Sequence, residues 1–367
     1  MDDLGTGAAG ALAVLDRCCL DVARRGRLTR FGQWAFGEFL ATTVAQRLTV
    51  VDAVSRRPAL AGVALPAPLF VVGWYRSGTT FLHHLLARLP WLRALSYWEL
   101  RHPTASSTGR VAAAKARTGL ANGIHRLLSP RFQSVHPVRV GQPEECMHLF
   151  DHSLTTPTPA FLTEAQEFLR ETTPGEILAA YQFYELQLRI LHAAGDGRRL
   201  LLKWPYHLFH LDTLLDVFPN ARVVWIHRDP AVALPSVCSL TEITRAPFCH
   251  EVDRPRLGAF WMERYESALP AALTGRERLG PERLLDLHVD RLARDPLGCV
   301  SRLSAWCDHD LDSDQRRRLE AHLASRPLGK SRGHRYSAGT YGLSEAGIRR
   351  RFRRYVEVCR EVGSRES

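Results

Sequence analysis

Short apolar runs alternate along this chain with segments whose apolar residues recur at helical spacing. Three of the runs are almost wholly apolar and predict buried strands of a parallel sheet. They are residues 69–72, 200–202 and 221–226. Residues 92–103 predict a short strand that leads into a loop, and residues 283–290 predict a further strand. Helical spacing over residues 208–218, between two of these strands, gives a β-α-β crossover, which implies helices on the faces of the sheet.

Ahead of the first strand, residues 8–57 predict two helices. The first runs from Ala8 to Arg25, and the second ends before Pro58 and carries an apolar stripe. The stripe consists of Phe31, Trp34, Phe39, Leu40, Val44, Leu48 and Val51. We expect the stripe to be buried against the main domain, so that residues 1–65 form an N-terminal helical extension and residues 66–367 form one α/β domain.

Later segments add helices and loops. Proline and polar residues predict loops over residues 155–165 and 241–258, and residues 104–130 predict a surface excursion around a basic helical piece. Long amphipathic helices are expected over residues 174–192 and 258–273.

The composition is that of an ordinary soluble globular protein. Of the 367 residues, 45% are apolar and 24% are charged, and no run reaches the roughly 20 apolar residues of a membrane helix. The net charge of +11 suits acidic ligands. The N-terminus lacks the basic region of a signal peptide, and the eight cysteines include no C-x-x-C pair. These features predict a cytoplasmic protein with reduced thiols and no structural zinc site.

A glycine-containing loop follows the first strand and is the strongest local signal in the chain. Gly73 and Gly78 have the spacing of a nucleotide-binding P-loop, but the lysine that should follow the second glycine is absent. The cation is instead Arg76, inside the loop, and Thr79 and Thr80 open the next helix. A helix N-terminus after such a loop binds anions, and arginine grips them with a planar fork. The sequence therefore predicts a cradle for a phosphate-like group without the arrangement of a kinase.

Two further cations are expected at the same edge of the sheet. Lys203 ends one predicted strand and Arg228 follows another. Ligands of α/β proteins bind beyond the carboxyl ends of the parallel strands, so these groups and the loop should meet there.

Other candidate sites are weaker. His148 and Glu145 have the side chains of metal ligands, but their spacing of three residues does not make a site, and we expect no metal. The arginines of the last helix predict a solvated face rather than a nucleic-acid surface, because few aromatic side chains are interleaved with them. They are Arg349, Arg350, Arg351, Arg353 and Arg354. Homo-oligomerisation through the N-terminal helices stays open.

Together these motifs resemble the sulfotransferases that use 3′-phosphoadenosine 5′-phosphosulfate (PAPS), above all their bacterial, actinobacterial branch. YRSGTTF is similar to the loop that holds the 5′-phosphosulfate in that family. Arg228 and Ser236 are similar to an arginine and a serine, eight positions apart, that hold the 3′-phosphate. WEL near residue 98, PEEC at 143–146, LLKWPYHL at 201–208 and HRYSAGTYGL at 334–343 extend the resemblance in the right order.

The resemblance implies a P-loop-like, three-layer α/β fold and specific roles for matching residues. The loop and helix start, Arg76, Ser77, Gly78, Thr79, Thr80 and Phe81, would bind the 5′-phosphosulfate. Arg332 and Gly333 resemble the segment that closes over the 3′-phosphate, and Lys203 resembles the lysine that assists departure of the cofactor. His288 lies where relatives often have a tyrosine near the adenine.

Sulfuryl transfer to a small-molecule hydroxyl is the reaction implied. Positioning and fixed cations would stabilise the charge, as in phosphoryl transfer, so that no metal is needed. Glu99, in an E-x-R pattern with Arg101, is the first candidate for the general base, and the others, in order, are His136, Glu145 and His102. The alternatives are a P-loop kinase, with Asp229 holding Mg²⁺, and a non-catalytic binder of nucleotides or nucleic acid.

The acceptor stays open between a phenol, a polyketide, a lipid and a glycolipid. Aromatic residues near the motifs suggest an apolar pocket, and a share in this pocket is an alternative to packing on the main domain for the stripe of the second helix. They are Trp74, Tyr75, Trp98, Phe150, Phe161, Phe183, Trp204 and Phe248.

Overall fold

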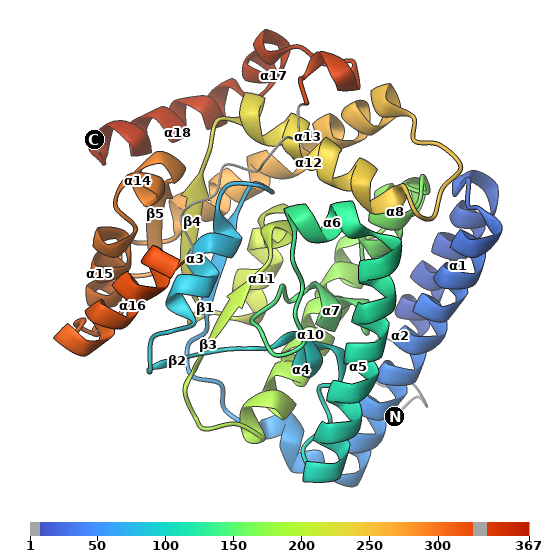
Figure 1. The fold of residues 1–367 in the computed structure, drawn as a ribbon, viewed down its shortest axis with the longest axis horizontal. Coiled ribbons are helices and arrows are strands. Elements are labelled where there is room, and N and C mark those ends of the chain that lie inside the picture. Colours follow the sequence, from blue (N-terminus) through green and yellow to red (C-terminus); the bar gives the residue numbers. More distant parts are fainter. Residues whose placement is uncertain (1–7, 326–335, 367) are drawn as a thin grey trace. The chain divides into compact units, whose positions relative to one another are not determined.

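The computed structural model describes residues 8–325 and 336–366, and the chain divides into two compact units (Figure 1). The sheet unit comprises residues 67–94, 198–239 and 254–367. The helical unit comprises residues 1–66, 95–197 and 240–253. The N-terminal helices thus group with two later segments, and the division at residues 65 and 66 stays a prediction.

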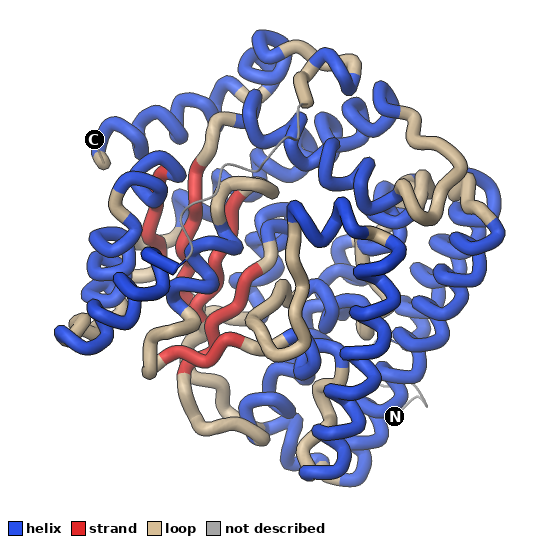
Figure 2. The backbone as a smooth tube through the Cα atoms, viewed as in Figure 1, coloured by secondary structure: helices blue, strands red, loops and turns tan. Residues whose placement is uncertain are grey.

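Five parallel strands form the centre of the sheet unit (Figure 2). They are β1 (Leu69–Gly73), β2 (Leu92–Ala94), β3 (Arg199–Lys203), β4 (Arg222–His227) and β5 (Leu284–His288). Their order is β2-β3-β1-β4-β5, so β1 lies between β3 and β4. Val71 of β1 pairs with Lys203 of β3, and Gly73 pairs with Ile226 of β4. The α/β fold with a parallel sheet, predicted from the apolar runs, is confirmed.

Helices of the sheet unit cover both faces of this sheet. They are α3 (Thr79–Leu86), η2 (Pro205–His210), α11 (Leu211–Val217), α13 (Arg254–Arg278), α14 (Val289–Arg294), α15 (Pro296–Trp306), α16 (Ser313–Ser325), η3 (Gly339–Tyr341), α17 (Glu345–Arg351) and α18 (Arg353–Arg365). Side chains alternate between the faces of a strand. Val71 accordingly belongs to a core shared with α3 and α15, whereas the neighbouring Phe70 packs on Phe218, with ring centroids 5.3 Å apart.

The helical unit contains most of the remaining helices. They are α1 (Ala8–Arg25), α2 (Arg30–Arg56), η1 (Pro58–Gly62), α4 (Tyr97–Arg101), α5 (Thr108–Leu128), α6 (Pro130–Val135), α7 (Met147–Asp151), α8 (Thr158–Leu162), α9 (Glu167–Arg170) and α10 (Pro174–Ala193). Helix α12 (Pro230–Arg245) is shared between the two units. Val50 of α2 packs on Phe183 and Ile190 of α10, and the two helices predicted before Pro58 are confirmed.

Two expectations about local structure are wrong. Strand β2 is only three residues long, and the segment that follows it turns into helix α4 instead of a loop. The cause is a capping box in which Ser96 and Glu99 each satisfy a backbone group of the other. The expected loops over residues 155–165 and 241–258 are also too long, because α8 occupies Thr158–Leu162, α12 continues to Arg245 and α13 begins at Arg254.

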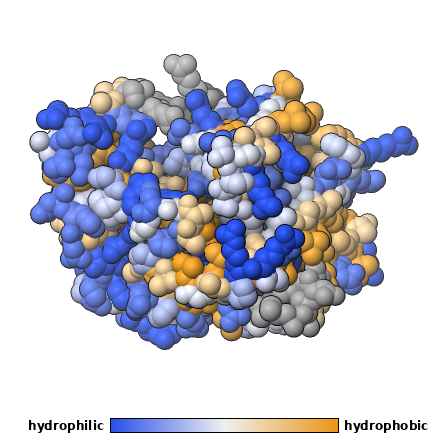
Figure 3. Space-filling model, turned by 90° about the horizontal axis from the view of Figure 1, so that it is seen from below, coloured by the Kyte–Doolittle hydropathy of each residue, from blue (hydrophilic) through white to orange (hydrophobic). Residues whose placement is uncertain are grey.

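The apolar stripe of α2 is buried only in part. Trp34 is 58% exposed and Leu48 is 44% exposed, so the expectation of burial is wrong for these two residues, and the other five stripe residues are only half-buried. The buried residues of α2 are instead Gly32, Phe36, Thr43, Arg47 and Val50. Figure 3 shows one face of the molecule, on which hydrophobic residues gather in patches between hydrophilic ones. Among the described residues, no helix has the length and apolar character needed to cross a bilayer.

Candidate active site

The loop between β1 and α3 has a backbone that only particular residues adopt easily. Gly73 has a φ of 151°, and a Cβ there would lie 2.5 Å from the carbonyl oxygen of Ile226. Gly78, the N-cap of α3, has a φ of 94°. Arg76 has a φ of 68°, a left-handed conformation that costs a non-glycine residue about 1–2 kcal/mol. The surrounding structure must therefore hold the loop in this form.

The start of α3 offers backbone N–H groups to an anion. The first helical hydrogen bond runs from the amide of Leu82 to the carbonyl of Gly78, at 3.1 Å, so the amides of Thr79, Thr80 and Phe81 have no acceptor within the helix. The Ser77 amide differs, because it donates to the carbonyl of Trp74 at 3.1 Å. The Ser77 hydroxyl is buried without a hydrogen-bond partner among the described residues.

Lys203 lies at the carboxyl end of β3, next to this helix start. Its side chain is fully buried, and its ammonium donates to the hydroxyl of Thr80 at 3.1 Å. A buried ammonium requires compensating polar groups, which an anion at the helix start would supply. The expectation that Lys203 and the loop meet at one edge of the sheet agrees with this contact.

Arg228 follows the neighbouring strand β4 and contacts the same loop. Its guanidinium donates to the carbonyl of Arg76. The adjacent Asp229 instead binds Arg349 at 2.8 Å and accepts the amide of Ala231 at 2.9 Å. Three neighbouring strands, β3, β1 and β4, thus each bring a cation or a loop to one edge. The Asp229 carboxylate, which a kinase would use for Mg²⁺, already has a cationic partner.

Ser236, on α12, has a hydroxyl partner that the sequence did not single out. The hydroxyl of Tyr336 donates to the hydroxyl of Ser236 at 2.7 Å, and Ser236 is buried. Tyr336 belongs to the HRYSAGTYGL motif, which contributed to the family resemblance, but the sequence assigned no role to this tyrosine. The predicted contacts of Arg332 and Gly333 lie outside the described residues.

In the helical unit, Glu99 has a structural task on α4. Its carboxylate accepts hydrogen bonds from the amide of Ser96 at 2.9 Å and from the hydroxyl of Ser96 at 2.6 Å. The segment before PEEC is bound to α4, because the amide of Trp98 donates to the carbonyl of Val140 at 3.1 Å. The amide of Glu144 likewise donates to the carbonyl of Leu95 at 3.2 Å. Two segments that are distant in sequence, one with Glu99 and one with two glutamates, are held together in this way.

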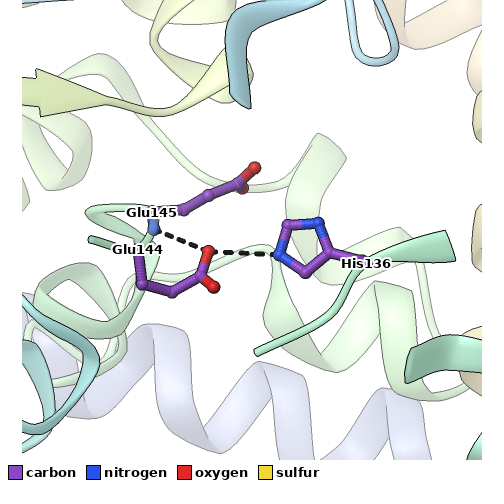
Figure 4. A group of neighbouring side chains, drawn as sticks. All are labelled: His136, Glu144 and Glu145. Atoms are coloured by element: carbon purple, nitrogen blue, oxygen red, sulfur yellow. Dashed lines mark hydrogen bonds and ion pairs between the residues drawn. The ribbon is translucent and has the colours of Figure 1, made fainter. Parts of the chain in front are cut away.

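His136, Glu144 and Glu145 form a cluster beside these segments (Figure 4). The His136 ring lies 3.1 Å from a Glu144 carboxylate oxygen, and the same oxygen accepts the amide of Glu145 at 2.8 Å. One ligand atom from each residue lies within 4.8 Å of the others. Both glutamates are buried, so the cluster combines a histidine with an orienting carboxylate, as a general base requires. The expectation of no metal stays a prediction.

Two other histidines named from the sequence, His102 and His288, have different surroundings. Burial, with the nearby charges of Arg101 and Arg117, lowers the pKa of His102 to about 4, which makes it a weak base at neutral pH. The ring of His288 accepts the amide of Asp290 at 3.3 Å, and His288 is thereby the N-cap of α14. The contact of His288 with an adenine stays a prediction.

An apolar cavity lies within the helical unit. Its volume is about 370 Å³, and helices α2, α4 and α5 all contribute to its wall. Its larger apolar lining residues include Phe31, Trp34, Phe39, Ile124, Leu128 and Phe248. Of the aromatic residues near the motifs only Phe248 lines it, whereas Phe31, Trp34 and Phe39 belong to the stripe for which a share in the pocket was the alternative. Trp74 and Trp204, for example, are core residues, and Trp74 stacks on Tyr265 with ring centroids 3.7 Å apart.

Comparison with protein families gives one match that covers most of the chain. Residues 68–313 match the model of the sulfotransferase family. A curated relative, the omega-hydroxy-beta-dihydromenaquinone-9 sulfotransferase Stf3 of Mycobacterium bovis, is 28% identical over 257 residues. The match covers 68% of this chain and 64% of the relative, so the chain spans somewhat less than two thirds of the length of that protein.

Solved structures are similar over nearly the whole chain. The crystal structure of sulfotransferase STF1 from Mycobacterium tuberculosis H37Rv has a TM-score of 0.77 and 25% identity, and covers 96% of this chain and 94% of that one. Sulfotransferase STF9 from Mycobacterium avium has a TM-score of 0.81 and 23% identity, and covers 98% of this chain and 91% of that one. The likeness to STF9 concerns the fold alone. Both matches cover enough of this chain to include the N-terminal helices.

Proposed function

The chain belongs to the sulfotransferase family, and from this premise we propose that it transfers a sulfuryl group from PAPS to the hydroxyl of a small-molecule acceptor. In the reaction, the acceptor oxygen forms a bond to sulfur while the bond from sulfur to the phosphate oxygen breaks. The acceptor hydroxyl loses its proton to a base, and adenosine 3′,5′-bisphosphate leaves. Products are the sulfate ester and this nucleotide.

One observation carries the proposal: anion-binding groups come from three neighbouring strands of the sheet unit. Loop 74–78 with the α3 N-terminus follows β1, Lys203 ends β3 and Arg228 follows β4. Contacts from Lys203 to Thr80 and from Arg228 to the carbonyl of Arg76 join them. An enzyme for this transfer needs fixed positive groups where charge develops on the equatorial and leaving oxygens.

The donor has two anionic ends, and the residues present fit both. We assign the 5′-phosphosulfate to Arg76 and to the amides of Gly78, Thr79, Thr80 and Phe81, since a helix N-terminus favours negative charge. The Ser77 hydroxyl is a further group that this end of PAPS would satisfy, while the Ser77 amide already has an acceptor in the loop.

The other groups serve the leaving phosphate and the 3′-phosphate. Lys203, buried beside Thr80, would stabilise the charge that grows on the leaving oxygen. Arg228 and Ser236 would hold the 3′-phosphate, with Tyr336 orienting the Ser236 hydroxyl. We retain Arg332 and Gly333 as further groups for that phosphate, on the resemblance of the sequence. PAPS supplies an activated sulfuryl group, and every other contribution comes from the protein.

The acceptor proton needs a base, and we propose Glu99 first and His136 second. Glu99 comes first because of the E-x-R pattern that it forms with Arg101, and one of its carboxylate oxygens is held in place by the two hydrogen bonds from Ser96. His136 has the Glu144 carboxylate to orient its ring and to stabilise the imidazolium that would form. Glu145 follows as part of the same cluster, and His102 comes last because of its lowered pKa. A base in position contributes about 10²–10⁴ to the rate.

The acceptor is proposed to carry its hydroxyl on a largely apolar body. Support comes from the apolar cavity of the helical unit, to which Tyr97 and Arg101 contribute from the same short helix as Glu99. The name of the Mycobacterium bovis relative gives it a hydroxylated menaquinone as acceptor, a molecule of this general kind.

Incubation with PAPS and a panel of hydroxyl compounds tests the proposal. The panel should contain phenols, long-chain alcohols, polyketide alcohols and sugars, and mass spectrometry should detect one added SO₃ group together with released adenosine 3′,5′-bisphosphate. An Arg228→Ala variant is the matched negative control for donor binding. Absence of transfer to every compound, with no affinity for adenosine 3′,5′-bisphosphate in calorimetry, would contradict the proposed function.

A further inference from the structure

Helix α5 buries small and polar residues and exposes large apolar ones, which is the reverse of the usual distribution. A surface helix of a soluble protein buries its large apolar residues and exposes its polar ones. The buried residues of α5 are instead Ala114, Thr118 and Asn122, and the Asn122 amide donates to the carbonyl of Val138 at 3.1 Å. Small and polar residues therefore hold α5 to the rest of the helical unit.

Four large apolar residues of α5 are exposed. Leu120 is 69% exposed, Ile124 is 45%, Leu127 is 83% and Leu128 is 44%. Their spacing of i, i+4, i+7 and i+8 places them on one side of the helix. Four exposed apolar residues on one face are a cluster rather than the scattered single residues that are normal on a protein surface.

Positive charge accompanies this face, and the same segment has no acidic residue. Helical spacing places Arg110 and Arg117 beside the apolar residues, whereas Lys115 lies over the Trp98 ring at 5.2 Å. Residues 100–143 contain no Asp or Glu. Their exposed cations include Arg110, Lys115, Arg117, Arg126 and Arg131. A solvated helix of a soluble protein mixes both signs of charge, whereas a basic segment with an apolar face is typical of helices that lie on anionic membranes.

The apolar face continues into the cavity of the helical unit. Ile124 and Leu128 line the cavity while remaining exposed, and so does Trp34 from α2. Tryptophan is enriched at the boundary between lipid and water. The wall of the cavity is apolar enough to receive a hydrocarbon chain, and Glu38 is the acidic residue of its lining.

We propose that the exposed face of α5 docks on an anionic lipid bilayer, with its leucines in the acyl boundary and its cations at the headgroups. The apolar side chains supply the burial energy, and the acid-free basic segment selects anionic over neutral lipid. The cavity beside the face would then take up the chain of a lipid from the bilayer. The docking does not depend on the reaction proposed above, because no residue of the donor site takes part in it.

Vesicle flotation with the full chain tests this docking. Two kinds of large unilamellar vesicle serve as probes, one of phosphatidylcholine alone and one with a third of its lipid as phosphatidylglycerol. We expect the protein to float with the anionic vesicles, to stay unbound with the neutral ones, and to be released as the salt concentration rises. Equal flotation with both vesicles, or with neither, would overturn the proposal.

Two pairs of leucines provide a matched comparison. Leu120→Gln with Leu127→Gln changes side chains that point to solvent and do not line the cavity, so the fold should be retained. Because full burial of each leucine contributes about 1.5–3 kcal/mol, the pair should lower the vesicle affinity about a hundredfold or more. Leu12→Gln with Leu20→Gln, exposed by 42% and 47% on α1, is the control and should float like the wild type.

Charge and self-association are separated by two further measurements. Arg110→Gln with Arg117→Gln should lower the affinity for anionic vesicles about twenty-fivefold, at about fivefold for each cation. Light scattering in the absence of lipid should give the mass of a monomer for both the wild type and the Leu120→Gln, Leu127→Gln variant. A dimer that this variant dissociates would show that a second copy covers the face, and would refute membrane docking.

Discussion

Replacement of Glu99 by glutamine separates the capping role that the structure shows for this carboxylate from the catalytic role that we propose for it. Glutamine fits the same position of a capping box, so it can still accept the hydrogen bonds from Ser96 that now measure 2.9 and 2.6 Å. It cannot take a proton. If Glu99 is the general base, Glu99→Gln should lower kcat by about 10²–10⁴, equivalent to about 2.7–5.4 kcal/mol of activation free energy.

The assay must show that only the chemical step has changed. We expect an unchanged melting temperature and unchanged calorimetric affinity for adenosine 3′,5′-bisphosphate, while single-turnover sulfation slows. Ser96→Ala is the control, because it removes the cap hydroxyl, costs about 0.5–2 kcal/mol of stability and leaves the carboxylate in place. Glu99→Gln with wild-type turnover would refute the assignment, and His136→Gln would then be the next variant to assay.

Three further predictions concern donor binding and stability. Arg228→Ala should weaken binding of adenosine 3′,5′-bisphosphate about tenfold to a hundredfold and leave binding of AMP unchanged, whereas equal loss for both in calorimetry would mean that Arg228 acts only through the loop. Tyr336→Phe should weaken the same ligand about twofold to tenfold, with no change in melting temperature, because it removes the hydrogen bond to Ser236; full affinity would contradict that role. Burial lowers the pKa of three histidines to about 3, so protonation of the unfolded chain should lower the unfolding free energy as the pH falls below about 6.5, by about 1.4 kcal/mol per pH unit for each. The three are His152, His207 and His210. Urea denaturation at pH 7 and pH 5 measures this loss, and equal stability at the two values would contradict it.

The sheet edge that carries Lys203, Arg228 and the loop after β1 was the part of the molecule that the sequence predicted best. Its residues follow strands that are apolar runs, and the carboxyl ends of parallel strands always share an edge. The contact from Lys203 to Thr80 follows from this rule alone. The partnership of Ser236 with Tyr336 does not, because it depends on a return of the chain from a segment a hundred residues away.

Local chemistry within the helical unit was harder to predict. The capping box of Ser96 and Glu99 uses a hydroxyl and a carboxylate three residues apart, and it makes a helix where apolar periodicity suggested a strand that leads into a loop. The prediction that the apolar stripe of α2 is buried was wrong at Trp34 for a different reason. Periodicity identifies a side chain as apolar, but whether it faces the core, a cavity or solvent is decided by tertiary packing.

The position of β1 between β3 and β4 has a consequence for how the protein folds. The contacts that join the donor groups span 123 residues, from Lys203 to Thr80, and 152 residues, from Arg228 to Arg76. Closing such long loops costs entropy before any contact repays it, and parallel pairing of this kind forms slowly. Helix α3 and its loop can form early from local sequence, but the proposed binding of a nucleotide needs β3 and β4 to have docked as well. Recovery of nucleotide affinity during refolding should therefore coincide with completion of the sheet and lag behind the recovery of helical signal.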